Sequence, residues 1–443
     1  MNSEKTPIQG KRNIDFTSVF SIVLLVLAGE AIFILPFVLQ RIFRPTFLET
    51  FALTNTEIGS CFSVYGIIAM FSYLFGGPLA DRFKPHLLMS VALLLTGLGG
   101  FFLSTYPSVF YLHVLYGFWG FTTIFLFWAA MIKATRIWGG ENAQGIAFGL
   151  LDGGRGLVAA LFGSAGVFVF SFFLTQDIDV STLEERKIAF EQVIVYASAA
   201  VCLIGLLVFI FLRHLNSHSK ENINANKKDT VDSEPGKLRF SDFKTVIKYR
   251  SVWLLMIIIL CAYFSYKMTD VFSLYANEVM LFNEVESAEI GTYLLYLRPL
   301  FGVGIGLLAD RTRASLWIVI GFFIVLVTSL FFASGLLNSN LVVLFSISIA
   351  LMALGVYSLR TLYFAVLEEA KIPLAITGTA IGVISVVGYT PDIFAGPLMG
   401  YFLDANPGAI GLQHTFGLMA GFALIGFLAS IALMRYNRNF DRL

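Results

Sequence analysis

The sequence predicts an all-α polytopic membrane protein with twelve transmembrane helices in two six-helix bundles. Three observations predict this fold: the composition, a charged motif that recurs about half a chain later, and the placement of the basic residues. The 443-residue chain is 57% hydrophobic and 13% charged, with a mean hydropathy of +0.79. Soluble proteins average about 25% charged residues, so lipid is the expected solvent. Segments that cross lipid must satisfy their backbone internally, which here means helices.

Apolar runs long enough to cross a bilayer occur twelve times. A hydrocarbon core of roughly 30 Å is crossed by about 20 residues of α-helix. In the first half, the runs predict spans at residues 16–40, 58–79, 87–104, 108–132, 144–173 and 190–212. In the second half, they predict spans at residues 251–280, 288–308, 315–336, 341–367, 374–403 and 414–434. An even number of crossings places both chain ends on one side of the membrane.

A hydrophilic segment separates the two sets of six spans. Residues 213–250 are rich in Lys, Asn, Asp and Ser and poor in apolar residues, a composition typical of a flexible linker. We therefore expect three parts. They are an N-terminal six-helix bundle (1–212), a linker (213–250) and a C-terminal six-helix bundle (251–443).

A short charged loop follows the second span and recurs, in weaker form, after the eighth. Residues 77–84 read Gly-Pro-Leu-Ala-Asp-Arg-Phe-Lys, and residues 306–313 read Gly-Leu-Leu-Ala-Asp-Arg-Thr-Arg. Each copy lies between two long apolar runs. A motif repeated at about half of the chain length indicates two halves of similar architecture.

The basic residues fix the expected orientation. Of the 30 Lys and Arg residues, 22 lie in the termini and in the loops after even-numbered spans. Only four lie in the opposite loops, namely Arg41, Arg44, Arg186 and Lys187. Under the positive-inside rule, both termini and the linker are cytoplasmic. We expect an integral multi-pass protein of the plasma (inner) membrane.

Twelve spans as six plus six, a long cytoplasmic linker and a Gly-x-x-x-Asp-Arg loop in each half together resemble the major facilitator superfamily (MFS). The resemblance covers the whole chain, although residues 83–86 (Phe-Lys-Pro-His) depart from the usual basic ending of the loop. It implies two bundles that rock about a central cavity and expose one binding site to each side in turn. Internal repeats with a site near the midplane are also what transporter physics favours.

The two charged loops are expected to act as a gate. Their glycines allow neighbouring helices to approach closely, and their aspartates lie at helix ends, where they can meet helix dipoles or arginines of the other half. Such contacts would hold the cytoplasmic side shut; a solvated turn is the alternative. The expected gate residues are Gly77, Asp81, Arg82, Gly306, Asp310 and Arg311.

Eight charged residues fall inside the predicted spans. Charges at the bilayer centre are costly and therefore indicate function. The basic ones are Arg155, Lys267, Arg298 and Arg360, and the acidic ones are Glu30, Asp152, Asp270 and Asp392. Counting 1.5 Å per residue places Arg155, Arg298, Arg360 and Glu30 roughly 14–21 Å inside the membrane. Asp152 with Arg155 and Lys267 with Asp270 are spaced as structural pairs on one helix face.

Arginines near the midplane predict an anionic solute. The guanidinium fork matches carboxylate and phosphate groups, so Arg298, Arg360, Arg155 and Lys267 are the expected substrate-binding residues. This set is similar to those of the organic-anion and organophosphate branches of the superfamily. A buried carboxylate can carry the coupling proton. Glu30 and Asp392 are the leading candidates, followed by Asp152 and Asp270, and Pro391 is expected to kink the helix beside Asp392.

The sequence therefore predicts a secondary transporter of a small polar, anionic organic solute, coupled to H⁺ and acting as a monomer. A symporter of amino acids, nucleosides or sugars is the alternative, and a transporter-like solute sensor is a more distant one. We expect no enzyme, because no nucleophile–base set is evident. We also expect no metal, cofactor or nucleic-acid partner, since the five His show no ligand spacing and no Walker loop is present.

Overall fold

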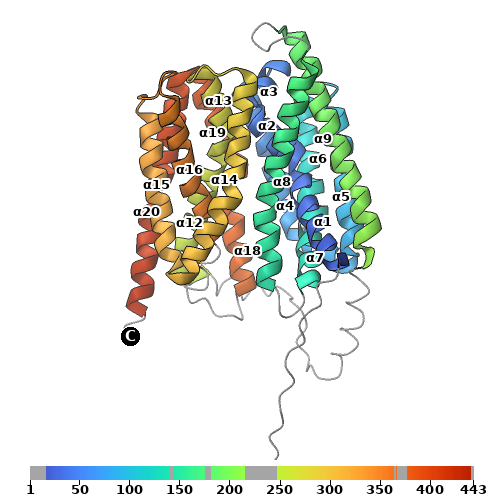
Figure 1. The fold of residues 1–443 in the computed structure, drawn as a ribbon. Helices are drawn as coiled ribbons and strands as arrows, with labels where there is room; N and C mark the ends of the chain where they lie inside the picture. The colour runs from blue at the N-terminus through green and yellow to red at the C-terminus, as the bar shows by residue number, and fades with distance from the viewer. Residues whose placement is uncertain are drawn as a thin grey trace, which may run out of the picture.

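The computed structural model describes residues 16–139, 144–174, 181–214, 247–363, 366 and 377–440. These residues form helices joined by short turns (Figure 1). Ten segments are long and apolar enough to cross a membrane. The helix α4 (Asn55–Arg82) and the pair α18 (Thr377–Gly388) and α19 (Pro391–Ala405) complete the twelve. The predicted all-α, twelve-helix membrane fold is confirmed.

In the first half, α1 (Phe16–Phe33), the π-helix η1 (Ile34–Val38) and α2 (Leu39–Ile42) form one continuous span, which the short α3 (Arg44–Thr50) follows. The fourth span likewise contains a π-helix. The remaining elements of this half are α5 (Pro85–Leu103), α6 (Val109–Gly120), η2 (Phe121–Trp128), α7 (Ala129–Gly139), α8 (Gln144–Phe173), α9 (Leu183–Phe211) and η4 (Leu212–His214).

In the second half, the seventh span is interrupted by a 3₁₀ turn, and the eleventh is broken before Pro391, where a kink was predicted. Proline at the start of α19 needs no backbone donor there. The remaining elements are α12 (Arg250–Lys267), η5 (Met268–Val271), α13 (Phe272–Glu278), α14 (Glu284–Arg311), α15 (Ala314–Ala333), α16 (Val342–Leu362) and α20 (Ala409–Phe440).

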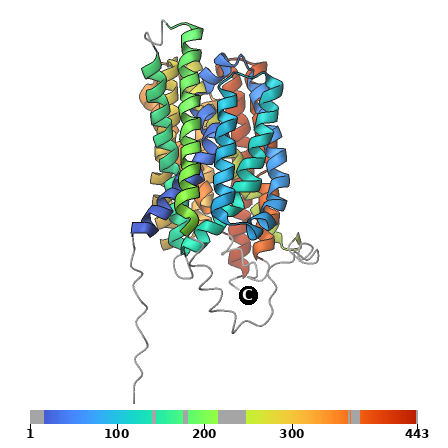
Figure 2. The same cartoon turned by 90° about the vertical axis from the view of Figure 1, so that its right-hand side faces the viewer.

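The helices gather into two groups that lie side by side, α1–α9 in one and α12–α20 in the other (Figure 1). Each group has its own apolar core: one is built almost entirely from residues 22–212, and the other from residues 252–433. The start of α1 and the end of α20 lie at the same end of the molecule (Figure 2). We call this the proximal end and the opposite one the distal end. Residues 215–246 of the predicted linker lie outside the described residues, so the division at 212 and 250 stays a prediction.

Three helices that begin at the distal end each have a capping box at their N-terminus. Thr54, Thr182 and Asn283 each accept a hydrogen bond from the backbone N–H three residues later, and a Glu at that later position bonds back. This capping box satisfies two backbone donors that a helix start leaves free. It fixes where α4, α9 and α14 begin and so sets the depth of the side chains farther along them.

The two groups touch closely in the distal half. Gly59 of α4 faces Gly396 of α19, and a Cβ atom on either would overlap the other backbone. The carboxylate of Asp404 accepts hydrogen bonds from the N–H groups of Asn55 (2.9 Å) and Thr56 (2.7 Å), across the boundary between the groups. The described structure is therefore closed at the distal end.

The proximal part of α14 is more open. A Cβ atom added at Gly304 or Gly306 would meet no atom within 4 Å. Among the described residues, no helix therefore packs on Gly306 in this conformation, and its role in the gate stays a prediction. Gly302, one turn earlier, approaches the hydroxyl of Thr361 within its own half.

Candidate solute-binding site

A cavity of about 100 Å³ lies between the two groups of helices. Its walls come from α1–α2, α4, η2, α8, α12, α14 and the tenth and eleventh spans. Most of the expected substrate and proton residues line it. The charged lining residues are Glu30, Arg41, Arg155, Lys267, Arg298, Arg360 and Asp392. The structure thus brings together side chains that lie up to several hundred residues apart in the sequence.

One ion-pair network joins α1, α8 and α14. Arg155 Nε donates to Glu30 Oε2 at 2.9 Å. Arg298 of the other half reaches Glu30 Oε1 at 3.7 Å and Asp152 Oδ1 at 3.6 Å. The expected pairing of Asp152 with Arg155 is wrong, because each binds a residue of another helix. Arg155 pairs with Glu30 of α1, and Asp152 pairs with Arg298 of α14. Glu30, Arg155 and Arg298 are all buried.

A second network lies closer to the distal end. Arg41 Nε contacts Asp270 Oδ1 at 2.5 Å, and Arg41 Nη1 donates to the hydroxyl of Tyr266 at 2.9 Å. Lys267 lies between two carboxylates, 3.9 Å from Asp270 Oδ2 and 3.4 Å from Asp392 Oδ1. The predicted Lys267–Asp270 pair is confirmed, but it belongs to a larger chain of charges. That chain crosses the boundary between the groups through Arg41.

Arg41 and Arg44 were expected in a loop; this is wrong for Arg41, which belongs to the first span, whereas Arg44 begins the short helix α3 in the connection to the second span. The first span continues through η1 and α2 to Ile42 and so includes Arg41. Both arginines are buried, and Arg44 donates to the side-chain oxygen of Asn55. The apolar run ends at residue 40, which is why the sequence suggested a boundary there. The better signal was Pro45, which lies at the start of α3 and marks the actual break.

Arg360 differs from the other basic residues of the cavity. Among the described residues, no carboxylate lies within the 4.0 Å ion-pair distance of its guanidinium. Its Nη1 is buried and has no hydrogen-bond partner, and its guanidinium carbon lies 3.8 Å from the centre of the Tyr266 ring. Arg298 Nη2 likewise lacks a hydrogen bond. Donors left unsatisfied in a buried site are costly, so an acceptor from outside is expected to complete them.

Tyrosines line the cavity around Arg360. Tyr263 and Tyr389 meet edge to face at 4.8 Å, Tyr73 stacks on Tyr389 at 6.3 Å, and the hydroxyls of Tyr363 and Tyr389 are 3.2 Å apart. Tyr263 also donates to Asp392 Oδ1 at 2.9 Å. These rings come from α4, α12 and the tenth and eleventh spans. They give the cavity an amphipathic wall with hydroxyls beside apolar faces.

The predicted gate residues lie at the proximal end. The side chains of Arg82 and Arg311 are exposed there. The surroundings of Gly77 and the side chains of Asp81 and Asp310 are outside what the structure describes, so the latch between the two loops stays a prediction. Within the described part of the chain, no three His, Cys, Asp or Glu side chains are grouped so that they could hold a metal ion.

Comparisons with known proteins agree with this architecture. The chain is 27% identical over 415 residues to the inner membrane protein YihN of Escherichia coli, covering 93% of this chain and 94% of that protein. It is 26% identical over 404 residues to the inner membrane protein YqcE of the same organism, covering 90% of each.

Two solved structures share the fold. A bacterial homologue of the human lysosomal transporter Spinster, in an inward-facing and unoccupied conformation, superposes with a TM-score of 0.70 at 16% identity, covering 96% of this chain and 99% of that one. The nucleoside transporter NupG superposes with a TM-score of 0.67 at 15% identity, covering 95% and 100%. The family model of the Major Facilitator Superfamily matches residues 19–395. This chain therefore belongs to the Major Facilitator Superfamily and is a multi-pass membrane protein of the secondary-transport type.

Proposed function

We propose that this protein is a proton-coupled symporter of a small organic anion. The observation that carries the proposal is the surplus of positive charge around Arg360. Five basic side chains line the cavity, while only two acidic ones do. Adding Asp152 and Asp270, which pair with Arg298 and Arg41, still leaves one cation in excess among the described residues. A buried cation without a partner is unfavourable, and an anionic solute would supply that partner.

The two ion-pair networks suggest how binding and proton transfer are coupled. A solute carboxylate or phosphate near Arg360 would compete with Glu30 and Asp152 for the loosely held Arg298. Asp392 is held by one lysine and one tyrosine, whereas Glu30 is held by two arginines. Protonating Asp392 breaks fewer ion pairs, so it is the proposed proton carrier. With its distal end closed, this conformation would exchange solute with the proximal end, which we assign to the cytoplasmic side by the positive-inside rule.

The substrate class is tested by a binding screen on the purified protein. Monocarboxylates, dicarboxylates and sugar phosphates are compared with amino acids, nucleosides and neutral sugars of similar size, and the midpoint of thermal unfolding is measured with each. A ligand that binds only the folded state at about 100 times its Kd stabilises by about 2.7 kcal/mol, so a bound solute raises the midpoint measurably.

We expect only the anions to raise the midpoint, and the shift to vanish in Arg360→Ala. A shift with nucleosides or neutral sugars that persists in Arg360→Ala would instead favour the alternative symporter. Binding without accumulation in proteoliposomes would indicate a sensor. Both outcomes contradict the proposal.

Replacing Asp392 by asparagine is expected to separate binding from coupling. The amide keeps the size of the side chain and an oxygen for the Tyr263 hydroxyl, but it cannot exchange a proton. Uptake driven by a pH gradient should fall to the level that the solute gradient alone supports, while exchange of internal for external solute continues. Solute-driven alkalinisation outside proteoliposomes, followed with a pH-sensitive dye, is the measurement. Glu30→Gln serves as the comparison, and unchanged coupling in Asp392→Asn would exclude Asp392 as the carrier.

A further inference from the structure

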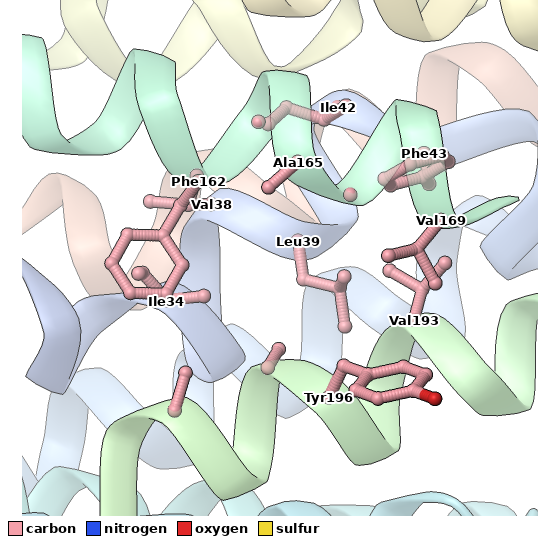
Figure 3. A pocket seen from close by; sticks show the side chains of 14 residues that line it. Ile34, Val38, Leu39, Ile42, Phe43, Phe162, Ala165, Val169, Val193 and Tyr196 are labelled. Carbon is pink, nitrogen blue, oxygen red and sulfur yellow. The ribbon is translucent and has the colours of Figure 1, made fainter. Parts of the chain in front are cut away.

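A second cavity, of about 220 Å³, lies on the other side of η1 from the solute site, between the first span and the helices α8 and α9 (Figure 3). Its lining is apolar apart from the hydroxyl of Tyr196. Ile34, Val38 and Leu39 form one wall, and Phe162 of α8 and Val193 of α9 form the others, with their side chains directed into the space (Figure 3). The first span leaves its regular α-helical path here, at η1.

The cavity opens towards lipid. Ala165 and Tyr196 at its rim are exposed, and the neighbouring outward faces carry Phe168 and Leu203, which are also exposed. Along α8, Val169 and Phe162 lie about 6 and about 17 Å from the distal helix end at Phe173. This range corresponds to one leaflet, about half of a hydrocarbon core of roughly 30 Å. The opening therefore lies at the depth of acyl chains.

Neither water nor a polar solute suits this space. Apolar cavities of about 150 Å³ stay dry and bind hydrocarbons such as benzene, and an empty void forfeits the dispersion contacts of its lining atoms. We propose that this side cavity binds one acyl chain of a phospholipid from the distal leaflet. This rests on the membrane-spanning fold and is independent of the proposed solute.

The bound chain would brace the first span where that span also shapes the solute cavity. Ile34 of η1 lines the side cavity, Phe37 lines the solute cavity, and Val38 contributes to the lining of both. Phe37 lies under Lys267 Nζ at 4.4 Å and stacks on Phe62 at 5.5 Å. The same short helix thus contacts lipid on one face and the ion-pair network on the other.

Photolabelling tests this site on the full-length protein in nanodiscs. The probe is a phosphatidylcholine with a diazirine midway along one acyl chain, and labelled residues are identified by mass spectrometry after proteolysis. We expect label on the lining residues Val193 and Phe162 in addition to the outward Phe168. Because interiors are close-packed, Ala197→Phe should fill the cavity and lower lining label about fivefold or more. Ala199→Phe, exposed on the same helix, should leave it unchanged.

The milder Ala197→Val provides the test if the phenylalanine variant fails to fold, with an expected reduction of about twofold, because a smaller volume is filled. Label confined to Phe168 and Leu203 in the unmodified protein would overturn the proposal. Lining label that is unaffected by both Ala197 variants would overturn it too. In either case the solute site and its tests remain unaffected.

Discussion

Arg360→Ala is expected to reduce uptake of the anionic solute by about 30-fold or more, because losing one partner of a buried charge pair costs about 2–5 kcal/mol. In the described structure Arg360 faces the cavity with no carboxylate in ion-pair range. Its removal therefore deprives the solute of a partner without freeing a protein carboxylate. The folded protein should keep its thermal midpoint in the absence of solute. Uptake by proteoliposomes and the unfolding midpoint are measured in parallel.

Two variants sharpen this prediction. Arg360→Lys keeps the charge but loses the planar fork and its stacking on Tyr266, so we expect uptake between those of the wild type and the alanine variant. Arg435→Ala removes an exposed arginine of α20 and should have no effect. Full uptake by Arg360→Ala would contradict the role of Arg360 as the anion anchor.

Arg41→Ala is expected to be the most destabilising single change among the cavity residues. It leaves Asp270, whose side chain is 0% exposed, with only Lys267 at 3.9 Å. Breaking a buried ion pair by removing one partner costs about 3–5 kcal/mol, because an uncompensated charge remains. The midpoint of thermal unfolding in detergent should fall clearly below that of the wild type. The Tyr266 hydroxyl also loses its hydrogen bond from Arg41.

A double-mutant cycle separates the charge effect from lost packing. If the pair is the cause, Arg41→Ala combined with Asp270→Ala should cost less than the sum of the two single changes, since no charge is left unpaired. Arg435→Ala is again the matched control for removing an arginine. Additive effects would show that Arg41 stabilises the protein through packing alone, and an unchanged midpoint would rule out a structural role.

The sequence by itself determined the membrane class, the number of spans and the identity of the intramembrane charges. These follow from properties that are local along the chain. Hydrophobic runs of sufficient length specify helices in lipid, and the repeated Asp-Arg loop marks the two halves. Helical rise also fixes depth, which is why Glu30, Arg155 and Arg298 were expected at one level and do meet there.

Only the tertiary structure decided which charges pair. Helical rise gives depth, but it does not give the direction in which a side chain faces another helix. Asp152 and Arg155 therefore looked like partners, yet they bind Arg298 and Glu30 across helix boundaries. Arg41 looked like a loop residue because apolar composition stops one residue earlier, although its helix continues. Among the described residues, Arg360 has no carboxylate partner, whereas the basic residues around it do. Which cations are paired depends on how the two bundles face each other.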